Sequence, residues 1–204
     1  MPNKNNFYTF VDTNPESITV LINRKYVLPA NYVPCDLVIP SIPFDFHGYH
    51  EKKLMRYEPA KALEKLFQKA CEETIFLNGI SGYRSYERQL AIYNKNIKEK
   101  GFEHTNQYCA KAGSSEHQSG LAIDVSTASI HNQLETSFAY TKEGKWLVNH
   151  CWKFGFILRY PKEKTHITGY AYEPWHIRYV GVKLASYLTK HHLTLEEFYR
   201  CDQI

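Results

Sequence analysis

The stretch SEHQSGLAID, residues 115–124, places two potential metal ligands beside a short apolar run. Residues 120–125 have the composition of a buried strand, and a carboxylate inside such a strand needs a charged partner or a metal ion to offset its desolvation. His117 precedes this strand, and a turn at residues 119–120 would fold its imidazole towards Asp124. The stretch therefore predicts half of a metal site on a buried strand.

A second cluster, Glu173-Pro174-Trp175-His176, opens another predicted strand further along the chain. Side chains in a strand alternate between its two faces, so His176 is expected to face the site while Trp175 packs on the other side. Pro174 bends the chain before the strand, which lets the carboxylate of Glu173 approach the pocket from its rim. That position suits a base that lies near a metal ion without ligating it.

Together, the two clusters predict a hydrolytic zinc site. His117, Asp124 and His176 would supply two nitrogens and one oxygen and leave a fourth tetrahedral position open, as a catalytic zinc site requires. Zinc activates water at neutral pH, and Glu173 could accept a proton as that water attacks an amide carbonyl. Arg84, at the end of a predicted short strand, is the candidate cation for the oxyanion or for a substrate carboxylate.

Three motifs resemble the VanY-type D-alanyl-D-alanine carboxypeptidases, a group related to the VanX dipeptidases, the bifunctional VanXY enzymes and the wall L,D-carboxypeptidases. They are SGYRS at 81–85, SxHxxGxAxD at 115–124 and EPWH at 173–176. The segments FILRYP at 156–161 and ITG at 167–169 are also similar to this family. The three motifs occur in the family's order, and the resemblance extends from about Val20 to Phe198.

The resemblance implies a role for each candidate site residue. The zinc ligands would be His117, Asp124 and His176. The catalytic base would be Glu173, the substrate or transition-state cation Arg84, and the contacts to the terminal alanine Ser115 and Gln89. Taken singly, a buried His or Asp is more often structural than a ligand, Ser115 could cap a turn and Gln89 could be solvated.

The activity implied by this resemblance is that of a zinc-dependent D,D-carboxypeptidase. Such an enzyme removes the last D-alanine from peptidoglycan stem peptides or precursors, which in glycopeptide-resistant bacteria removes the target of vancomycin. Within the family, an L,D-carboxypeptidase or a D-Ala-D-Ala dipeptidase is the alternative. In a different class, a non-catalytic binding module that keeps its zinc, as in the hedgehog signalling domain, is the other alternative. The presence of both Glu173 and Arg84 favours the hydrolase, because a structural zinc needs neither.

A rival metal cluster lies in the stretch HGYHE, residues 47–51. Its two histidines, His47 and His50, lie in a loop that contains proline and glycine, and no third ligand follows at a sensible spacing. The five cysteines form no Cys-x-x-Cys pair, which favours free thiols and makes a thiolate zinc site improbable.

Composition predicts one globular domain without a nucleic-acid or membrane segment. The 204 residues are 43% hydrophobic and 15% aromatic, enough for a full core. The net charge of +4 comes without a run of five Lys or Arg, so no nucleic-acid-binding arm is indicated. No apolar run approaches the roughly 18 to 20 residues that span a bilayer. We expect a monomer.

The first sixteen residues are polar, which divides the chain into an N-terminal tail, 1–16, and a catalytic domain, 17–204. The tail lacks the apolar core of a secretory signal. Two locations remain open: the exterior of the cell envelope, if an N-terminal anchor was removed, or otherwise the cytoplasm.

Hydrophobic periodicity predicts a mixture of helices and strands. Helices are predicted over 58–76, 86–100, 142–154, 183–190 and 195–199. Strands are predicted over 17–23, 79–85, 120–125, 156–160 and 175–180. Ser85 is the expected N-cap of the second helix and Gly101 its end, whereas 102–113 and 126–142 are expected to be irregular. The elements alternate without a strict βαβ repeat, which favours a single α+β domain with a small, mainly antiparallel central sheet flanked by helices.

Overall fold

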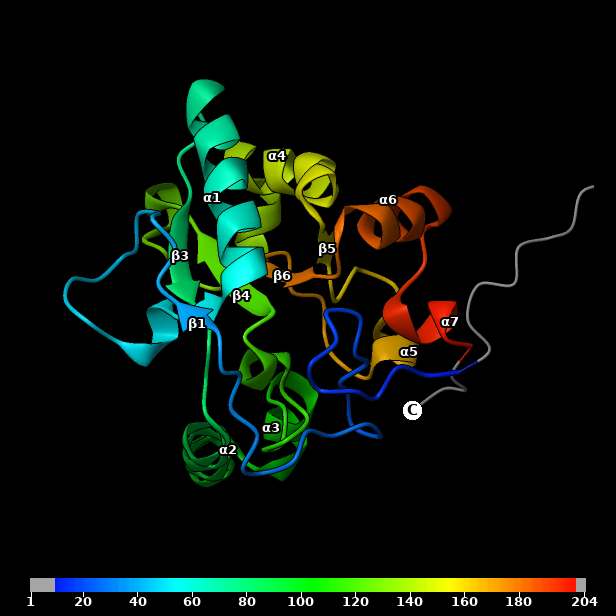
Figure 1. The fold of residues 1–204 in the computed structure, drawn as a ribbon. Coiled ribbons are helices and arrows are strands. Elements are labelled where there is room, and N and C mark those ends of the chain that lie inside the picture. The colour runs from blue at the N-terminus through cyan, green and yellow to red at the C-terminus, as the bar shows by residue number, and fades with distance from the viewer. Residues whose placement is uncertain (1–9, 201–204) are drawn as a thin grey trace, which may run out of the picture.

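A four-stranded antiparallel sheet lies at the centre of the domain, with the strand order β3-β4-β6-β5 (Figure 1). The computed structural model describes residues 10–200. The strands of this sheet are β3 (Asn78–Ser81), β4 (Ala122–Ser126), β5 (Phe156–Leu158) and β6 (His176–Tyr179). A separate antiparallel pair consists of β1 (Leu37–Val38) and β2 (Met55–Arg56).

Seven α-helices accompany the sheet in the described part of the chain. They are α1 (Tyr57–Glu72), α2 (Tyr86–Lys100), α3 (Phe102–Tyr108), α4 (Lys142–His150), α5 (Thr165–Thr168), α6 (Val182–His191) and α7 (Leu195–Phe198). In Figure 1, α1 and α4 lie above the sheet and α2 and α3 lie below it. The structure thus confirms the predicted single α+β domain with an antiparallel central sheet.

One face of the sheet carries the main hydrophobic core. Ile123 of β4 and Ile177 of β6 pair across the two strands and pack with Leu63 of α1 in one buried cluster that also includes residues of α4. Successive side chains of a strand point to opposite faces. The neighbouring residues Asp124 and His176 therefore project from the other face, away from α1 and α4.

The boundaries of α2 agree with those predicted from capping residues. The hydroxyl of Ser85 accepts a hydrogen bond from the backbone N–H of Arg88 at 3.2 Å, which satisfies a donor that the first turn leaves unpaired. At the other end, Gly101 adopts a φ of +82°, a conformation that other residues rarely take, and the helix stops there.

The strand predicted over 17–23 is wrong. This segment forms turns and extended backbone rather than a ladder. The carbonyl oxygens of Ile18 and Val20 instead accept hydrogen bonds from the buried guanidinium of Arg178, at 3.1 and 2.8 Å. The β-branched residues of this segment reflect its burial in the domain. The side chain of Arg178 supplies the hydrogen-bond donors that a neighbouring strand would otherwise supply.

The segment 102–113 is not irregular throughout, because α3 occupies its first seven residues. The backbone turn at Gly101 ends α2 and lets a new helix start at once in a different direction. The segment 126–142 is a loop in outline but contains two short 3₁₀ helices, Ala128–Ile130 and Thr136–Tyr140. Short helices of this kind lack the long apolar period on which the sequence prediction depends.

The predicted ends of the chain are only partly visible. Residues 1–9 of the polar tail and residues 201–204 of the domain lie outside the described residues, so the boundary at 16–17 remains a prediction. Where the tail is described, Asp12 contacts the body of the protein, because its carbonyl oxygen accepts a hydrogen bond from the backbone N–H of Leu21 at 2.8 Å. Among the described helices, none has the length and apolar character needed to cross a membrane.

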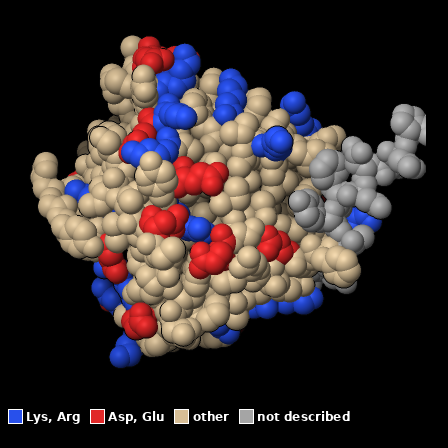
Figure 2. All heavy atoms as spheres, in the orientation of Figure 1, with Lys and Arg blue, Asp and Glu red and all other residues tan. Residues whose placement is uncertain are grey.

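Four cysteines, Cys35, Cys71, Cys109 and Cys151, have free thiols, in agreement with the prediction, while Cys201 lies outside the described residues. On the face shown in Figure 2, acidic and basic side chains are interspersed, and neither sign forms a continuous surface.

Candidate metal centre and active site

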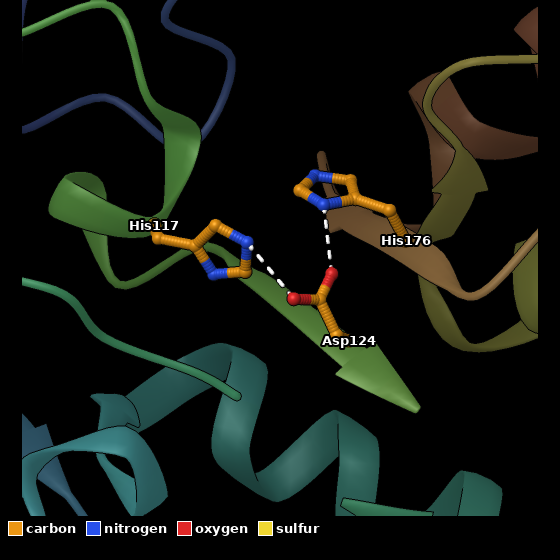
Figure 3. A group of neighbouring side chains, drawn as sticks. All are labelled: His117, Asp124 and His176. Atoms are coloured by element: carbon orange, nitrogen blue, oxygen red, sulfur yellow. Dashed lines mark hydrogen bonds and ion pairs between the residues drawn. The ribbon is translucent and has the colours of Figure 1, made fainter. Parts of the chain in front are cut away.

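Asp124 and His176 meet across the two central strands of the sheet. They are direct partners in the register of β4 and β6, on the face opposite the core, and both are almost fully buried. The Nδ1 atom of His176 lies 3.0 Å from Oδ1 of Asp124 (Figure 3). Strand pairing therefore brings two predicted ligands together although they lie 52 positions apart in the chain.

His117 approaches Asp124 from a 3₁₀ turn, Glu116–Ser119, that leads into β4. The turn ends at Gly120 with a φ of +67°. A Cβ at this position would lie 2.9 Å from the side chain of Leu37, so both the backbone conformation and the space require glycine. The turn places Nε2 of His117 3.3 Å from Oδ2 of Asp124 (Figure 3).

The three side chains fit a divalent metal ion. Each offers one ligand atom, and these atoms lie within 4.8 Å of one another. The other ring nitrogen of His117, Nδ1, lies 2.7 Å from the carbonyl oxygen of Gly82. Because a carbonyl can only accept, Nδ1 carries the hydrogen and Nε2 keeps a lone pair facing Asp124. A buried donor set of two imidazoles and one carboxylate is typical of a catalytic zinc site.

The electrostatics of this cluster favour a charged Asp124. Burial by itself would raise the pKa of Asp124, but the imidazoles of His117 and His176 outweigh it and hold the pKa well below its usual range. Burial lowers the pKa of His117. Burial also opposes the charging of His176, yet hydrogen bonds to Asp124 and Glu116 raise its pKa to about 9. A proton on His176 therefore competes with any metal ion for this site.

Glu173 lies beside the ligands and outside their cluster. Its Oε2 atom is 3.8 Å from Nδ1 of His176, and its backbone N–H donates to the carbonyl oxygen of Tyr160 at 3.1 Å. Burial, reinforced by the charge of Asp124, raises the pKa of Glu173 to about 7. A carboxyl group with a pKa near neutrality can both take up and release a proton at physiological pH.

Arg84 reaches the same centre from the loop between β3 and α2. Its Nη2 atom lies 3.9 Å from Oδ2 of Asp124, and its backbone N–H donates to the carbonyl oxygen of His117 at 3.2 Å. The guanidinium also donates to Oε1 of Gln89 at 2.9 Å and to the hydroxyl of Ser81 at 3.1 Å. These two hydrogen bonds fix its orientation over the metal ligands.

Gln89 and Ser115 are both buried. The amide oxygen of Gln89 accepts from Arg84, while its Nε2 donates to the carbonyl oxygen of Ala110 at 2.6 Å. Its described contacts therefore tie Arg84 to the segment after α3. Ser115 precedes the turn that carries His117, and among the described residues its hydroxyl makes no capping hydrogen bond with that turn. Direct contact of either residue with a substrate remains a prediction.

All of the predicted site residues line one cavity of about 230 Å³. These residues are Arg84, Gln89, Ser115, His117, Asp124, Glu173 and His176. Aromatic side chains, among them Tyr108, Tyr160 and Trp175, form part of its wall. Trp175 also packs against the main core, so it contributes to both. The cavity has a metal centre, a carboxyl group and a cation side by side.

The rival cluster does not form a metal site among the described residues. His50 caps a short 3₁₀ helix, Glu51–Lys53, where its Nδ1 accepts from the backbone N–H of Lys52 at 3.1 Å. Its other ring nitrogen lies 3.5 Å from the guanidinium of Arg88.

Sequence reasoning missed a charged network behind the site. Its members are buried and connect to His176: Glu116, Arg159, Arg178 and Glu196. Burial by itself would raise the pKa of Glu116, but the guanidinium groups of Arg159 and Arg178 hold it well below its usual range. Arg159 lies inside the predicted strand 156–160 and Arg178 inside the predicted strand 175–180. These two residues were the available signal, because a charged residue in an apolar strand needs buried partners.

Known proteins are similar in sequence to this chain over most of its length. The family model described as VanY, D-alanyl-D-alanine carboxypeptidase, matches residues 52–182. The putative carboxypeptidase YodJ of Bacillus subtilis (strain 168) is 46% identical over 186 residues, which cover 91% of this chain and 68% of that protein.

Two solved structures are also similar. The LdcB L,D-carboxypeptidase superposes with a TM-score of 0.88 and 46% identity, covering 92% of this chain and 87% of that one. A variant of the vancomycin-resistance D,D-pentapeptidase VanY, in complex with Zn(II), superposes with a TM-score of 0.72 and 32% identity, covering 88% of this chain and 97% of that one.

Proposed function

Because the chain belongs to the VanY family of D-alanyl-D-alanine carboxypeptidases, we propose that it is a zinc-dependent enzyme that releases the C-terminal D-alanine of a peptidoglycan stem peptide. It is a metallo-carboxypeptidase of that family. The observation that carries the proposal is the convergence of three buried metal-ligating side chains with Glu173 and Arg84 in one cavity.

We assign the zinc ion to His117, Asp124 and His176. Two neutral imidazoles and a carboxylate suit zinc, and the hydrogen bond from His117 to Gly82 prepares one nitrogen for it. The relative that is solved with Zn(II) supports this assignment. When bound, zinc supplies Lewis acidity, which polarises the scissile carbonyl and makes water a competent nucleophile near neutral pH.

Glu173 is the group that moves the proton in this proposal. Its carboxyl lies beside the ligands with a pKa of about 7. As a carboxylate it takes a proton from the attacking water, and as a carboxylic acid it then delivers that proton to the amine nitrogen of the departing D-alanine. The peptide C–N bond breaks, and the products are a shortened peptide and free D-alanine.

Arg84 is the group that binds negative charge. Its guanidinium is partly exposed to the cavity and is fixed by Gln89 and Ser81. A guanidinium and a carboxylate pair strongly through two parallel hydrogen bonds. Arg84 therefore holds the terminal carboxylate of the substrate, which is the group that makes the enzyme a carboxypeptidase rather than an internal peptidase.

Replacing this arginine tests that role. We expect Arg84→Gln to lower kcat/KM by about 10- to 100-fold, as the loss of a charged hydrogen bond predicts. The matched control is Arg88→Gln in the first turn of α2, because Arg88 pairs with Glu51 at 3.1 Å and does not line the cavity. Steady-state kinetics of alanine release measures both. Equal effects of the two substitutions would contradict a substrate role for Arg84.

Two bonds are candidates for cleavage. Hydrolysis after an L-amino acid, the L,D reaction, is our first candidate, since the LdcB L,D-carboxypeptidase has 46% identity and a TM-score of 0.88 to this chain. The D,D reaction, which the sequence motifs imply, is the second and is supported by the description of the family model. Only the D,D reaction removes a D-Ala-D-Ala terminus, so any contribution to glycopeptide resistance depends on it.

One assay separates these candidates. The purified protein is incubated, with and without zinc, with a stem tetrapeptide whose D-alanine follows an L-amino acid, a pentapeptide ending in D-Ala-D-Ala, and free D-Ala-D-Ala. We expect zinc-dependent release of D-alanine, fastest from the tetrapeptide. Faster release from the pentapeptide would establish the D,D reaction, and faster hydrolysis of the free dipeptide a dipeptidase. No release from any of the three would leave a zinc-containing binding module.

A further inference from the structure

A buried carboxylate, Glu116, lies between a proposed zinc ligand and two arginines. Its Oε2 atom is 3.4 Å from Nε2 of His176, the ring nitrogen that faces away from Asp124. Its Oε1 atom accepts one hydrogen bond from Nε of Arg159 and one from Nη1 of Arg178, each at 2.7 Å. The side chains of Glu116 and both arginines are 0% exposed.

The two arginines are themselves held in place. Arg159 forms a two-pronged ion pair with Glu196 of α7, through contacts of 2.9 and 2.6 Å. Arg178 donates to backbone carbonyl oxygens of the 17–23 segment and of β6. The network holds two guanidinium groups and two carboxylates, so its charges balance, and each oxygen of Glu116 has a fixed direction.

This arrangement fixes the position of the hydrogen on His176. A carboxylate only accepts hydrogen bonds, and therefore the ring nitrogen that faces Glu116, Nε2, carries the hydrogen. When zinc is bound the ring is neutral, and its lone pair is then on Nδ1, the nitrogen that lies 3.0 Å from Oδ1 of Asp124 and would ligate the metal with it. A carboxylate behind a metal-ligating histidine orients the ring and raises its basicity.

We propose that Glu116 is a positioning residue for the metal centre, which holds His176 as the tautomer that binds zinc and which Arg159 and Arg178 clamp in turn. The inference rests on the proposed function, since it takes His176 as a zinc ligand. It connects α7 to the metal centre through Glu196, Arg159 and Glu116. It also accounts for four charged groups inside the domain, whose burial costs more free energy than that of an apolar cluster.

The decisive variant is Glu116→Gln. The two guanidinium groups require an acceptor, so the amide oxygen takes the place of Oε1 and the NH₂ group faces His176. A donor in that position forces the hydrogen of the ring onto Nδ1, where it blocks the metal. We expect zinc affinity to fall by about 10- to 100-fold, measured by competition with a chromophoric chelator. Nitrogen chemical shifts of His176 in the zinc-free protein, recorded at a pH above the ring's pKa of about 9 so that the imidazole is neutral, should report the exchange of tautomers.

The matched control is Glu196→Gln, which alters the same network without touching His176. We expect its zinc affinity to stay within about threefold of that of the wild type. The loss of an outer-shell partner, by contrast, lowers zinc affinity by about 10- to 100-fold. Circular dichroism checks the folding of each variant. An unchanged zinc affinity in Glu116→Gln, or an equal loss in both variants, would overturn the proposal in favour of a purely structural network.

If Glu116→Gln does not fold, a double variant that removes one positive and one negative charge from the network keeps the test valid. Arg178→Gln alone is then compared with Arg178→Gln combined with Glu116→Gln, and the double variant should bind zinc about 10- to 100-fold more weakly than the single one. Equal affinities would overturn the proposal. If the wild-type protein itself binds no zinc, the proposed function fails, which is a different result from a failure of Glu116 to affect the affinity.

Discussion

Glu173→Gln is expected to lower kcat by about 100- to 10,000-fold, the range that general acid–base catalysis contributes. Glutamine keeps the shape of the side chain but can neither take up nor deliver a proton. Glu173 lies 3.8 Å from His176, outside the set of metal ligands. Zinc content and KM should therefore stay close to those of the wild type, and the loss should be confined to kcat.

The matched control is Glu163→Gln, an exposed glutamate in the loop between β5 and α5. We expect this variant to retain wild-type kinetics, because Glu163 does not line the cavity. Single-turnover release of D-alanine and metal analysis measure both variants. Retention of activity in Glu173→Gln would remove Glu173 from the reaction, and a parallel loss of zinc would make it a ligand instead of a base.

His117→Ala is expected to abolish stoichiometric zinc binding. It removes one of three ligand atoms, and its effect should exceed the about 10- to 100-fold loss that accompanies the removal of an outer-shell partner. Because the variant lacks the metal, its release of D-alanine should fall to background. The zinc-free variant should also be less stable than the zinc-free wild type, since the carbonyl of Gly82 loses a buried hydrogen bond and is left unpaired, at a cost of about 1 to 3 kcal/mol.

His50→Ala is the control, because His50 belongs to the rival histidine cluster of the sequence. Elemental analysis after dialysis should find a full complement of zinc in His50→Ala and little in His117→Ala. The reverse result would move the metal site to the loop that contains His50. Denaturation curves without metal separate the loss of the ligand from the loss of the hydrogen bond to Gly82.

The sequence alone was sufficient wherever the determining interactions are local. The start of α2 depends on Ser85 and its end on Gly101, both of which adjoin the helix. His117 and Asp124 lie seven positions apart across one glycine turn, and a carboxylate within a buried strand needs a charged partner or a metal ion. The cluster of Glu173 and His176 at the start of a predicted strand indicated the base and the third ligand, and the resemblance to a family implied the same roles.

The tertiary structure alone decided the interactions between residues far apart in the chain. The strand predicted at 17–23 does not form, because Arg178 binds the carbonyl groups that a neighbouring strand would need. Gln89 was predicted from the family as a substrate contact, and only the fold shows that its amide connects Arg84 to Ala110.

Glu116 is the clearest case of this division. In the sequence it is an unremarked neighbour of His117, and nothing local distinguishes it from a solvated glutamate. Its partners His176, Arg159 and Arg178 lie 60, 43 and 62 positions away. The sequence determined which side chains could hold a metal, since that depends on their chemistry and their place in a motif. Only the packing of the sheet decided which side chains orient them, because burial and charge pairing arise when distant segments meet.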